Sequence, residues 1–196
     1  MTQLGKLGPI FFFFMIFTPS AFAQDLKCEL RSDSGKVSFI AIGRPSALKI
    51  HGKGNGATGN AIIKGLGVSG SFNFDLSTLE TGMSLRDRHM KEKYLEIAKF
   101  PKAELTIVKM AIPGPLSLPS KFEKIPFEGA LKLHGVEVSV QGLASVERAG
   151  DYCNGTVTFS TKIPQYGIAP PSFAGIKVAD DVDVQVVFQS LLKEAP

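Results

Sequence analysis

Residues 126–147 read PFEGALKLHGVEVSVQGLASVE, and this stretch decides the fold. Apolar and polar residues alternate on both sides of a central His134-Gly135 pair. Such alternation is typical of a strand that buries one side and exposes the other, and a two-residue link that contains glycine is typical of a tight hairpin. The stretch therefore predicts two antiparallel strands, 126–133 and 136–147, joined by a two-residue turn.

The same alternation recurs along most of the chain and predicts roughly eight strands in all. Eight segments fit the pattern, 27–32, 36–42, 46–52, 60–75 with a bend at Gly65 and Gly67, 102–110, 126–133, 136–147 and 155–163, and a last one follows at 181–190. Asn154-Gly155 is interpreted as a second turn. Short antiparallel strands avoid open edges by closing into a barrel or by stacking as a sandwich. The sequence thus predicts an all-β fold and leaves these two architectures open.

One segment, residues 84–95, breaks the alternation and reads SLRDRHMKEKYL. It contains helix-forming residues and neither glycine nor proline, so we expect a short helix. Ser84 is predicted to cap its first turn, with Asp87 close to the positive end of the helix dipole. Phe100-Pro101 then favours extended backbone and marks the return to the sheet.

The first 23 residues predict a secretory signal peptide. Lys6 is the one charged residue before a continuously apolar run, 10–17, and Ala21-Phe22-Ala23 matches the small-x-small pattern of a cleavage site. We expect cleavage before Gln24, which leaves 173 of the 196 residues as one domain, 24–196. The apolar run is too short to span a bilayer, and no later run is longer, so we expect no transmembrane helix.

Charge and cysteine content narrow the class of protein. The chain has 22 Lys and Arg against 18 Asp and Glu, and the basic residues are scattered, which excludes the basic stripe of a nucleic-acid binder. In an oxidising compartment Cys28 and Cys153 are predicted to form a disulfide; two buried, unpaired thiols are the alternative.

The densest polar cluster is Arg86-Asp87-Arg88-His89. Asp87 and His89 could act as an acid/base pair, but residues two apart on a helix point in different directions. The favoured interpretation is structural: Asp87 caps the helix, and Arg86 or His89 pins it to the barrel.

Neither a metal nor a cofactor is expected. His51, His89 and His134 are far apart in sequence and form no metal-ligand spacing, and Gly67-Val68-Ser69-Gly70 does not have the spacing of a serine nucleophile.

The apolar side of the strands is the sequence feature that does point to a function. An eight-stranded barrel is just wide enough to be filled by side chains or to hold one slender ligand, and the sequence leaves a packed core and an apolar tunnel open. If the lumen is open, twelve inward-facing residues are predicted to contact the ligand: Phe39, Phe72, Phe74, Leu76, Leu105, Ile107, Leu131, Leu133, Val138, Phe159, Val184 and Phe188.

Several motifs in order resemble the YceI family of exported bacterial proteins. They are SGKVSF at 34–39, VSGSFNFD at 68–75, RDRHM at 86–90, FPKAEL at 100–105, GALKLHGV at 129–136 and YGI at 166–168. The resemblance runs from about residue 34 to 189. Two features depart from the family pattern: Lys162-Ile163-Pro164-Gln165 stands where an Arg is usual, and the segment after Gly43 is rich in glycine. Without tryptophan, the chain lacks the G-x-W signature of true lipocalins.

The resemblance implies an antiparallel, eight-stranded, lipocalin-like β-barrel with the helical segment at its mouth. It also implies a periplasmic, non-catalytic binding or carrier protein for a long-chain isoprenoid or fatty-acyl-type amphiphile. Two alternatives stay open: a packed structural or interaction barrel without ligand, and an enzyme that uses Asp87 and His89 on an amphiphile. The sequence also leaves a homodimer open.

Overall fold

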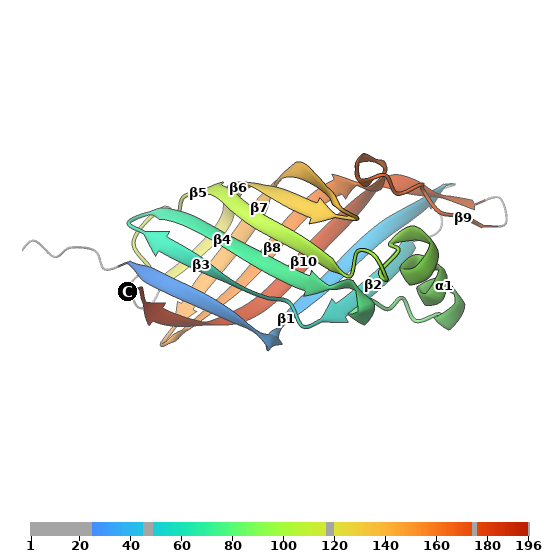
Figure 1. The fold of residues 1–196 in the computed structure, drawn as a ribbon. Coiled ribbons are helices and arrows are strands. Elements are labelled where there is room, and N and C mark those ends of the chain that lie inside the picture. Colours follow the sequence, from blue (N-terminus) through green and yellow to red (C-terminus); the bar gives the residue numbers. More distant parts are fainter. Residues whose placement is uncertain (1–24, 45–48, 117–119, 174–175, 196) are drawn as a thin grey trace, which may run out of the picture.

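The computed structural model describes residues 25–44, 49–116, 120–173 and 176–195 (Figure 1). The predicted signal peptide, 1–23, and its cleavage site lie outside the described residues. Among the described residues, no helix is long and apolar enough to cross a membrane.

Antiparallel strands make up most of the chain. They are β1 (Leu26–Arg44), β2 (Lys49–Asn55), β3 (Thr58–Lys64), β4 (Gly67–Asp75), β5 (Lys102–Met110), β6 (Ser120–Leu133), β7 (Val136–Ala149), β8 (Tyr152–Lys162), β9 (Ser172–Phe173) and β10 (Ile176–Glu194). The short helices are η1 (Leu76–Thr78), α1 (Ser84–His89), the π-helical turn η2 (Met90–Tyr94) and η3 (Ile163–Tyr166).

The sheet closes on itself, because β1 pairs with β10 as well as with β2 and β3. β3 pairs with the first part of β1, 26–30, and β2 with the later part, 36–42, so these two short strands share one place in the ring. The ring therefore has eight places, and β9 is a short addition beside β10. The predicted eight-stranded antiparallel barrel with one short helix is confirmed, and the sandwich is excluded.

The central hairpin agrees with its prediction. β6 ends at Leu133 and β7 begins at Val136, so His134 and Gly135 form a two-residue turn. Both have positive φ, 52° and 79°, which is the backbone that such a turn requires on a right-twisted pair of strands. The strands themselves are longer than predicted, because pairing continues past a register irregularity between Phe122 and Ile125.

Two predicted strand limits are wrong. The segments 27–32 and 36–42 are parts of the single strand β1, whose pairing with β10 shifts register between Leu30 and Gly35. The segment 60–75 is not one bent strand but the hairpin β3–β4, which turns at Gly65 and Leu66. Gly65 has a φ of 59° and so allows a reversal of the chain rather than a bend.

The predicted turn at Asn154-Gly155 is also wrong, since both residues lie inside β8. Gly155 faces Phe188 across the β8–β10 ladder, and the Phe188 ring occupies the place where a Cβ would project. This glycine is therefore explained by packing. The chain turns instead at Gly150 and Asp151, between β7 and β8.

The helical segment is confirmed, but its predicted cap is not. Ser84 is the first residue inside α1, the capping position belongs to Met83, and no side chain caps it. Asp87 reaches back instead, and its carboxylate accepts hydrogen bonds from the Thr81 backbone amide, at 2.7 Å, and from the Thr81 hydroxyl. Figure 1 shows α1 at the end of the barrel opposite the C-terminus. We call the end beside α1 the mouth and the opposite end the base.

Side chains pack the base tightly. Ile125 and Phe127 are each 2% exposed, and the Phe127 ring meets Phe159 edge to face at 6.5 Å. Ile112 and Leu116, from the connection between β5 and β6, are buried in the same cluster. The barrel interior is thus filled at its base.

Candidate binding cavity

A cavity of about 680 Å³ lies between this packing and the mouth. Its size falls within the usual range of small-molecule sites, about 300–1,000 Å³. Most of its 37 lining residues are apolar. Apart from Tyr94, the polar lining residues are Asn73, Thr81, Arg86, His89, Lys93, Thr161 and Ser172. The barrel interior is therefore packed with side chains at the base and hollow towards the mouth. The sequence left a packed core and an apolar tunnel open, and the structure contains a packed part and an open part.

Eleven of the twelve residues predicted to face a ligand line this cavity, so the structure brings them together. Val138 is the exception: it is half-buried and packs against the core cluster around the Phe127 ring. Strand alternation identified the inward side correctly, but it carries no information on how far along the barrel the side chains stop filling the space. Contact of the eleven with a ligand stays a prediction.

The sequence analysis missed the part of the wall that comes from the helical segment and from the β8–β10 connection. Met83, Leu85, Met90, Tyr94 and Leu95 line the cavity from the first, and Ile163, Ile168 and Pro171 from the second. Met83, Met90 and Tyr94 are spaced seven and four residues apart, which places them on one side of a helix. That spacing is the sequence feature from which these three lining residues could have been predicted.

Small residues opposite large rings leave room in the cavity. Phe39 faces Gly52 across the β1–β2 ladder, and Phe188 faces Gly155 across the β8–β10 ladder. In both pairs the ring lies where a Cβ of the glycine would be, so the ring rests against the barrel wall. The glycine-rich segment after Gly43, unusual for the family, thus serves in part to seat Phe39.

Thr81 anchors the helical segment to the barrel mouth. Besides the two hydrogen bonds to Asp87, its hydroxyl accepts one from Arg86 Nε at 2.7 Å, and its backbone carbonyl accepts one from Arg86 Nη2 at 2.6 Å. The Asp87 carboxylate is therefore engaged by Thr81. His89 is exposed and lines the mouth, and the hydrogen bonds recorded among the described residues include none from its ring.

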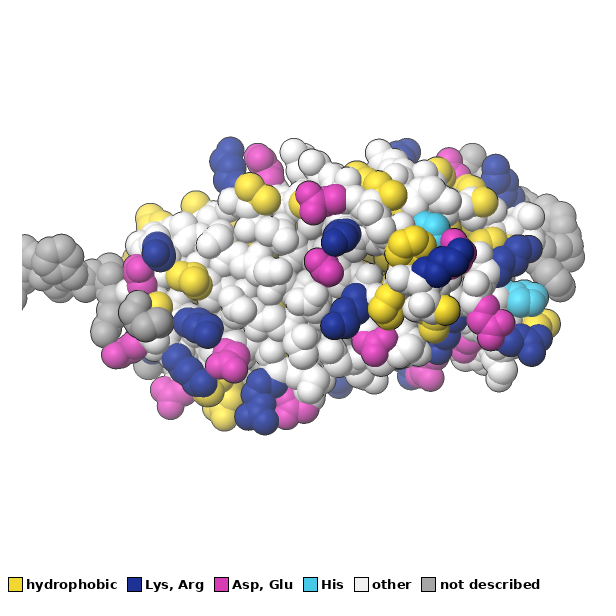
Figure 2. All heavy atoms as spheres, viewed as in Figure 1, with side chains coloured by type: hydrophobic (Ala, Val, Ile, Leu, Met, Phe, Trp, Pro, Cys, Tyr) yellow, Lys and Arg dark blue, Asp and Glu magenta, His cyan; other side chains and the backbone are white. Residues whose placement is uncertain are grey.

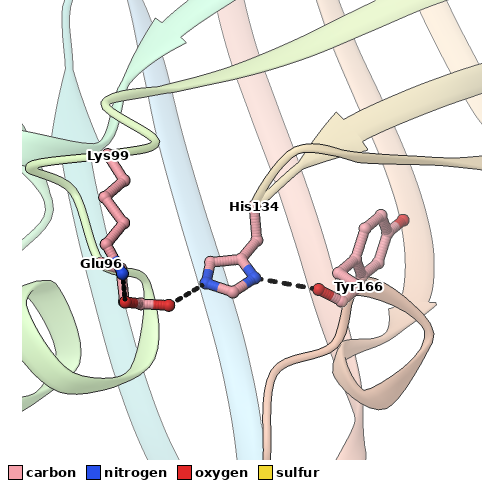
Figure 3. A network of polar contacts seen from close by, with 4 residues as sticks. All are labelled: Glu96, Lys99, His134 and Tyr166. Atoms are coloured by element: carbon pink, nitrogen blue, oxygen red, sulfur yellow. Dashed lines mark hydrogen bonds and ion pairs between the residues drawn. The ribbon is translucent and has the colours of Figure 1, made fainter.

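A second polar contact ties the segment after η2 to the β6–β7 turn and to η3, and Figure 3 shows its four residues. His134 Nδ1 lies 3.0 Å from the backbone carbonyl oxygen of Tyr166 and donates to it, and Nε2 lies 2.9 Å from Glu96 Oε2. Lys99 Nζ donates to the other Glu96 oxygen at 2.6 Å. The His134 side chain is only 14% exposed and packs against Phe100, with ring centroids 4.4 Å apart. This clamp of Glu96, His134 and Tyr166 joins the segment after η2, the β6–β7 turn and η3.

Two pKa values at these contacts shift. Hydrogen bonds from Lys99 and then from His134 hold the pKa of Glu96 below its usual range. Burial raises the pKa of Tyr166, whose hydroxyl lies 2.7 Å from Thr161 Oγ1.

The predicted disulfide is not formed: Cys28 and Cys153 are both buried and free. Cys28 lies on β1 and Cys153 on β8, which flank β10 on either side. Two strand spacings amount to about 9.6 Å, and a disulfide needs Cα atoms within about 7 Å. Contact with the Cys28 thiol, followed by burial, raises the pKa of Cys153, so this thiol is protonated. Both cysteines act here as small core residues at the base.

Within the residues that the structure describes, no group of three or more His, Cys, Asp and Glu side chains is placed to hold a metal ion.

Comparison with known proteins agrees with this architecture. The family model described as YceI-like domain matches residues 30–190. Among proteins of curated function, none matches the chain.

Solved structures share the fold at low sequence identity. A polyisoprenoid binding domain from Saccharophagus degradans, implicated in plant cell wall breakdown, superposes with a TM-score of 0.63 at 18% identity, covering 87% of this chain and 98% of that one. Burkholderia cenocepacia BcnA has a TM-score of 0.60 at 15% identity, covering 81% and 96% of the two chains. The Campylobacter jejuni YceI protein has a TM-score of 0.59 at 14% identity, covering 74% and 86%.

Identities this low show the fold alone, whereas the family model covers most of the chain. The barrel, its apolar cavity and this match lead to one conclusion: the chain belongs to the YceI-like domain family.

Proposed function

We propose that this protein is a periplasmic, non-catalytic binding or carrier protein that holds a long-chain isoprenoid or similar amphiphilic lipid in its barrel. The observation that carries the proposal is the cavity of about 680 Å³, whose walls are apolar except near the mouth. The polyisoprenoid binding domain with the same fold supports an isoprenoid as the ligand class.

The physical chemistry of the walls favours a long apolar chain. Each methylene transferred from water into an apolar site contributes about 0.8 kcal/mol, so one five-carbon isoprene unit contributes a few kcal/mol. Several buried units therefore outweigh the cost of ordering the ligand without any specific polar contact. A slender, unbranched or methyl-branched chain also suits the narrow interior of an eight-stranded barrel.

The contacts of Asp87 support a non-catalytic role. The Asp87 carboxylate, a candidate acid or base, is engaged by Thr81 at the start of the helical segment. Asp87 therefore helps to anchor the helical segment through Thr81. Among the described residues, the hydrogen bonds of Asp87 include none to His89.

Export is supported by the sequence of residues 1–23. Full-length protein expressed in a Gram-negative host should appear in the periplasmic fraction with Gln24 as its first residue. Recovery of the uncleaved chain from the cytoplasm would contradict the proposed location.

Ligand binding is tested by extracting the purified, folded protein with organic solvent and analysing the extract by mass spectrometry. We expect a long-chain lipid that co-purifies in proportion to the protein. If none is found, the emptied protein is offered a polyprenol in micelles and repurified. Failure to retain it, with the fold intact by circular dichroism, would contradict the proposal.

A further inference from the structure

The start of the helical segment exposes apolar side chains beside the opening of the cavity. Met83 and Leu85 are 57% and 52% exposed, although both line the cavity. Among the described large apolar residues at the surface, no two others stand this close in the chain. Exposed apolar side chains gathered in one place mark a surface that contacts another protein or a membrane. The mouth end of the barrel is therefore a candidate interaction surface.

Cations without ion-pair partners follow these two apolar residues in the chain. Arg86, Arg88, Lys91 and Lys93 form no ion pair with a described acidic side chain. Elsewhere on the described surface, seven lysines do form such pairs: Lys53, Lys64, Lys99, Lys109, Lys121, Lys162 and Lys193. Of the two acidic residues in the segment, Asp87 is already bound to Thr81. The segment thus has an excess of positive charge that is available to a partner.

The exposed residues of α1 and the turn after it share one face. Positions 85, 88, 89 and 92 are spaced as i, i+3, i+4 and i+7, which places their side chains on one side of a helix. They are Leu85, Arg88, His89 and Glu92, and all four are exposed. Lys93, the next residue, is exposed as well. This face is therefore apolar at the end beside the cavity and mainly basic beyond it, with one acidic residue.

β2 extends the basic surface next to α1. Lys53 and Glu80 exchange two backbone hydrogen bonds, of 2.9 and 2.8 Å, so β2 lies beside the residues that lead into α1 (Figure 1). Lys49 and His51 are exposed on the same outer face of β2 as Lys53, because side chains alternate along a strand. Figure 2 shows Lys, Arg and His side chains together with apolar ones, and with some acidic ones, at this end of the molecule.

From these observations we infer that the mouth end of the barrel docks on the surface of a membrane that contains anionic phospholipids. Met83 and Leu85 enter the boundary of the acyl chains, and Arg88, Lys93 and Lys49 lie against the phosphate groups. Binding of this kind combines burial of apolar area with attraction to anionic lipids, and each Lys or Arg near the surface adds about fivefold to the binding constant. The inference goes beyond the proposed function, because it names the surface on which the cavity opens and not what the cavity holds.

Two features favour a membrane over a protein partner. A stable protein interface takes about 20–30 residues on each side, whereas the exposed apolar part of this surface consists of Met83 and Leu85. The second feature is position. The apolar pair lies at the opening of a cavity that we propose to hold a lipid, so a docked barrel opens towards the bilayer and an apolar chain passes between the two without crossing water.

The absence of tryptophan from the chain allows a direct test of the docking surface. Leu85→Trp places a single fluorophore at the mouth, and Leu66→Trp places one at the base, where Leu66 is 46% exposed and its carbonyl accepts a hydrogen bond from the Ile112 amide. Both proteins are titrated with vesicles of phosphatidylglycerol and phosphatidylcholine in equal parts. We expect both to float with the vesicles. The emission of Leu85→Trp should shift to the blue and become protected from acrylamide, and that of Leu66→Trp should stay unchanged.

A charge variant tests the electrostatic part of the inference. Lys93→Gln should weaken flotation with the anionic vesicles by about fivefold at low salt, and the loss should shrink at high salt. The matched control is Lys124→Gln, which removes the same charge from an exposed lysine next to Ile125 at the base. It should change vesicle binding by less than about twofold, because exposed charges act weakly beyond direct contact. Vesicles of phosphatidylcholine alone should bind the unaltered protein weakly.

The outcomes separate this inference from the proposed function. A protein that retains a polyprenol but ignores the vesicles would overturn docking alone, and one that binds vesicles without retaining a polyprenol would contradict only the proposed function. Equal binding to neutral and anionic vesicles, or equal emission shifts at positions 85 and 66, would also overturn docking. Val186→Trp fills the cavity and should float like the unaltered protein. Loss of flotation in this folded variant would show that the cavity, and not the outer surface, holds the vesicle.

Discussion

At the mouth, the single residue His134 connects several segments of the chain. His134 is part of a two-residue turn, yet its ring also contacts Glu96, Phe100 and the Tyr166 backbone. The turn was predictable from alternation and Gly135. The clamp was not, because Glu96 and Tyr166 are 38 and 32 residues away from His134 and no local pattern connects them.

His134→Ala should lower stability by about 1–3 kcal/mol, because it removes a hydrogen bond from the Tyr166 carbonyl and the packing against Phe100. His89→Ala is the matched control, since that ring is exposed and should contribute almost nothing to stability. Chemical denaturation of both variants measures the difference. Equal stability of the two variants would contradict the structural role of the clamp.

Glu96 should make the thermal stability of the protein depend on pH in the acidic range. Its pKa is lowered in the folded protein by Lys99 and His134, so its stabilising effect is complete above the ordinary glutamate pKa of about 4.3 and is lost as the pH falls through the lowered value. Glu96→Gln should therefore flatten the fall of Tm between about pH 5 and pH 3. Thermal melts of the two proteins across this range test it; parallel curves would show that Glu96 contributes nothing.

For the strands and helices, the periodicity of the sequence predicted the type and approximate number correctly, but it often misplaced where they begin and end. The antiparallel strands and the helical segment follow from alternation and from its interruption at residues 84–95. Closure into an eight-place ring was implied by the family resemblance, because alternation alone left a barrel and a sandwich open. The bend at Gly65 and the turn at Asn154-Gly155 were wrong because a glycine reports a need for space or for positive φ and does not say which. At Gly155 the need is space for Phe188.

Gly155→Ala should push the Phe188 ring from the wall into the cavity and destabilise the protein by about 1–3 kcal/mol, as overpacking does. It should also weaken binding of a polyprenol. Gly67→Ala is the control, because the nearest atom to a Cβ there is the Lys64 carbonyl oxygen at an ordinary 3.5 Å. A Gly155→Ala protein that binds and unfolds like Gly67→Ala would show that the pairing does not shape the cavity.

The helical segment depends on Thr81 rather than on a cap of its own. Asp87→Ala removes the acceptor of two hydrogen bonds to Thr81 and should free the segment by about 1–2 kcal/mol while the barrel stays intact. Hydrogen exchange should accelerate in residues 84–94 and remain unchanged in β6 and β7. Arg88→Ala, exposed on α1, should leave both unchanged. Uniform acceleration along the whole chain would contradict a local anchor.

In the molecule as a whole, the two ends of the barrel interior differ. Packed side chains at the base, including two buried thiols, fill the lumen, and the mouth half keeps a cavity. Sequence alternation could assign which side chains point inward. It could not sum the volume that they fill, since that depends on register and on cross-strand pairs such as Phe39 with Gly52. For the same reason the disulfide prediction failed: the number of cysteines does not reveal that β10 lies between their strands.

The central claim is that the apolar cavity is the binding site, and two neighbouring residues of β10 test it most directly. Val186 lines the cavity, whereas Val187 is 45% exposed on the outside. Titration of a polyprenol into Val186→Trp and Val187→Trp, each first shown to be folded, compares the same added ring on the two faces of one strand. The account predicts that Val186→Trp loses at least about tenfold in affinity, as filling the space of two or more methylenes implies, and that Val187→Trp binds like the unaltered protein. Equal affinity of the two folded variants would contradict it.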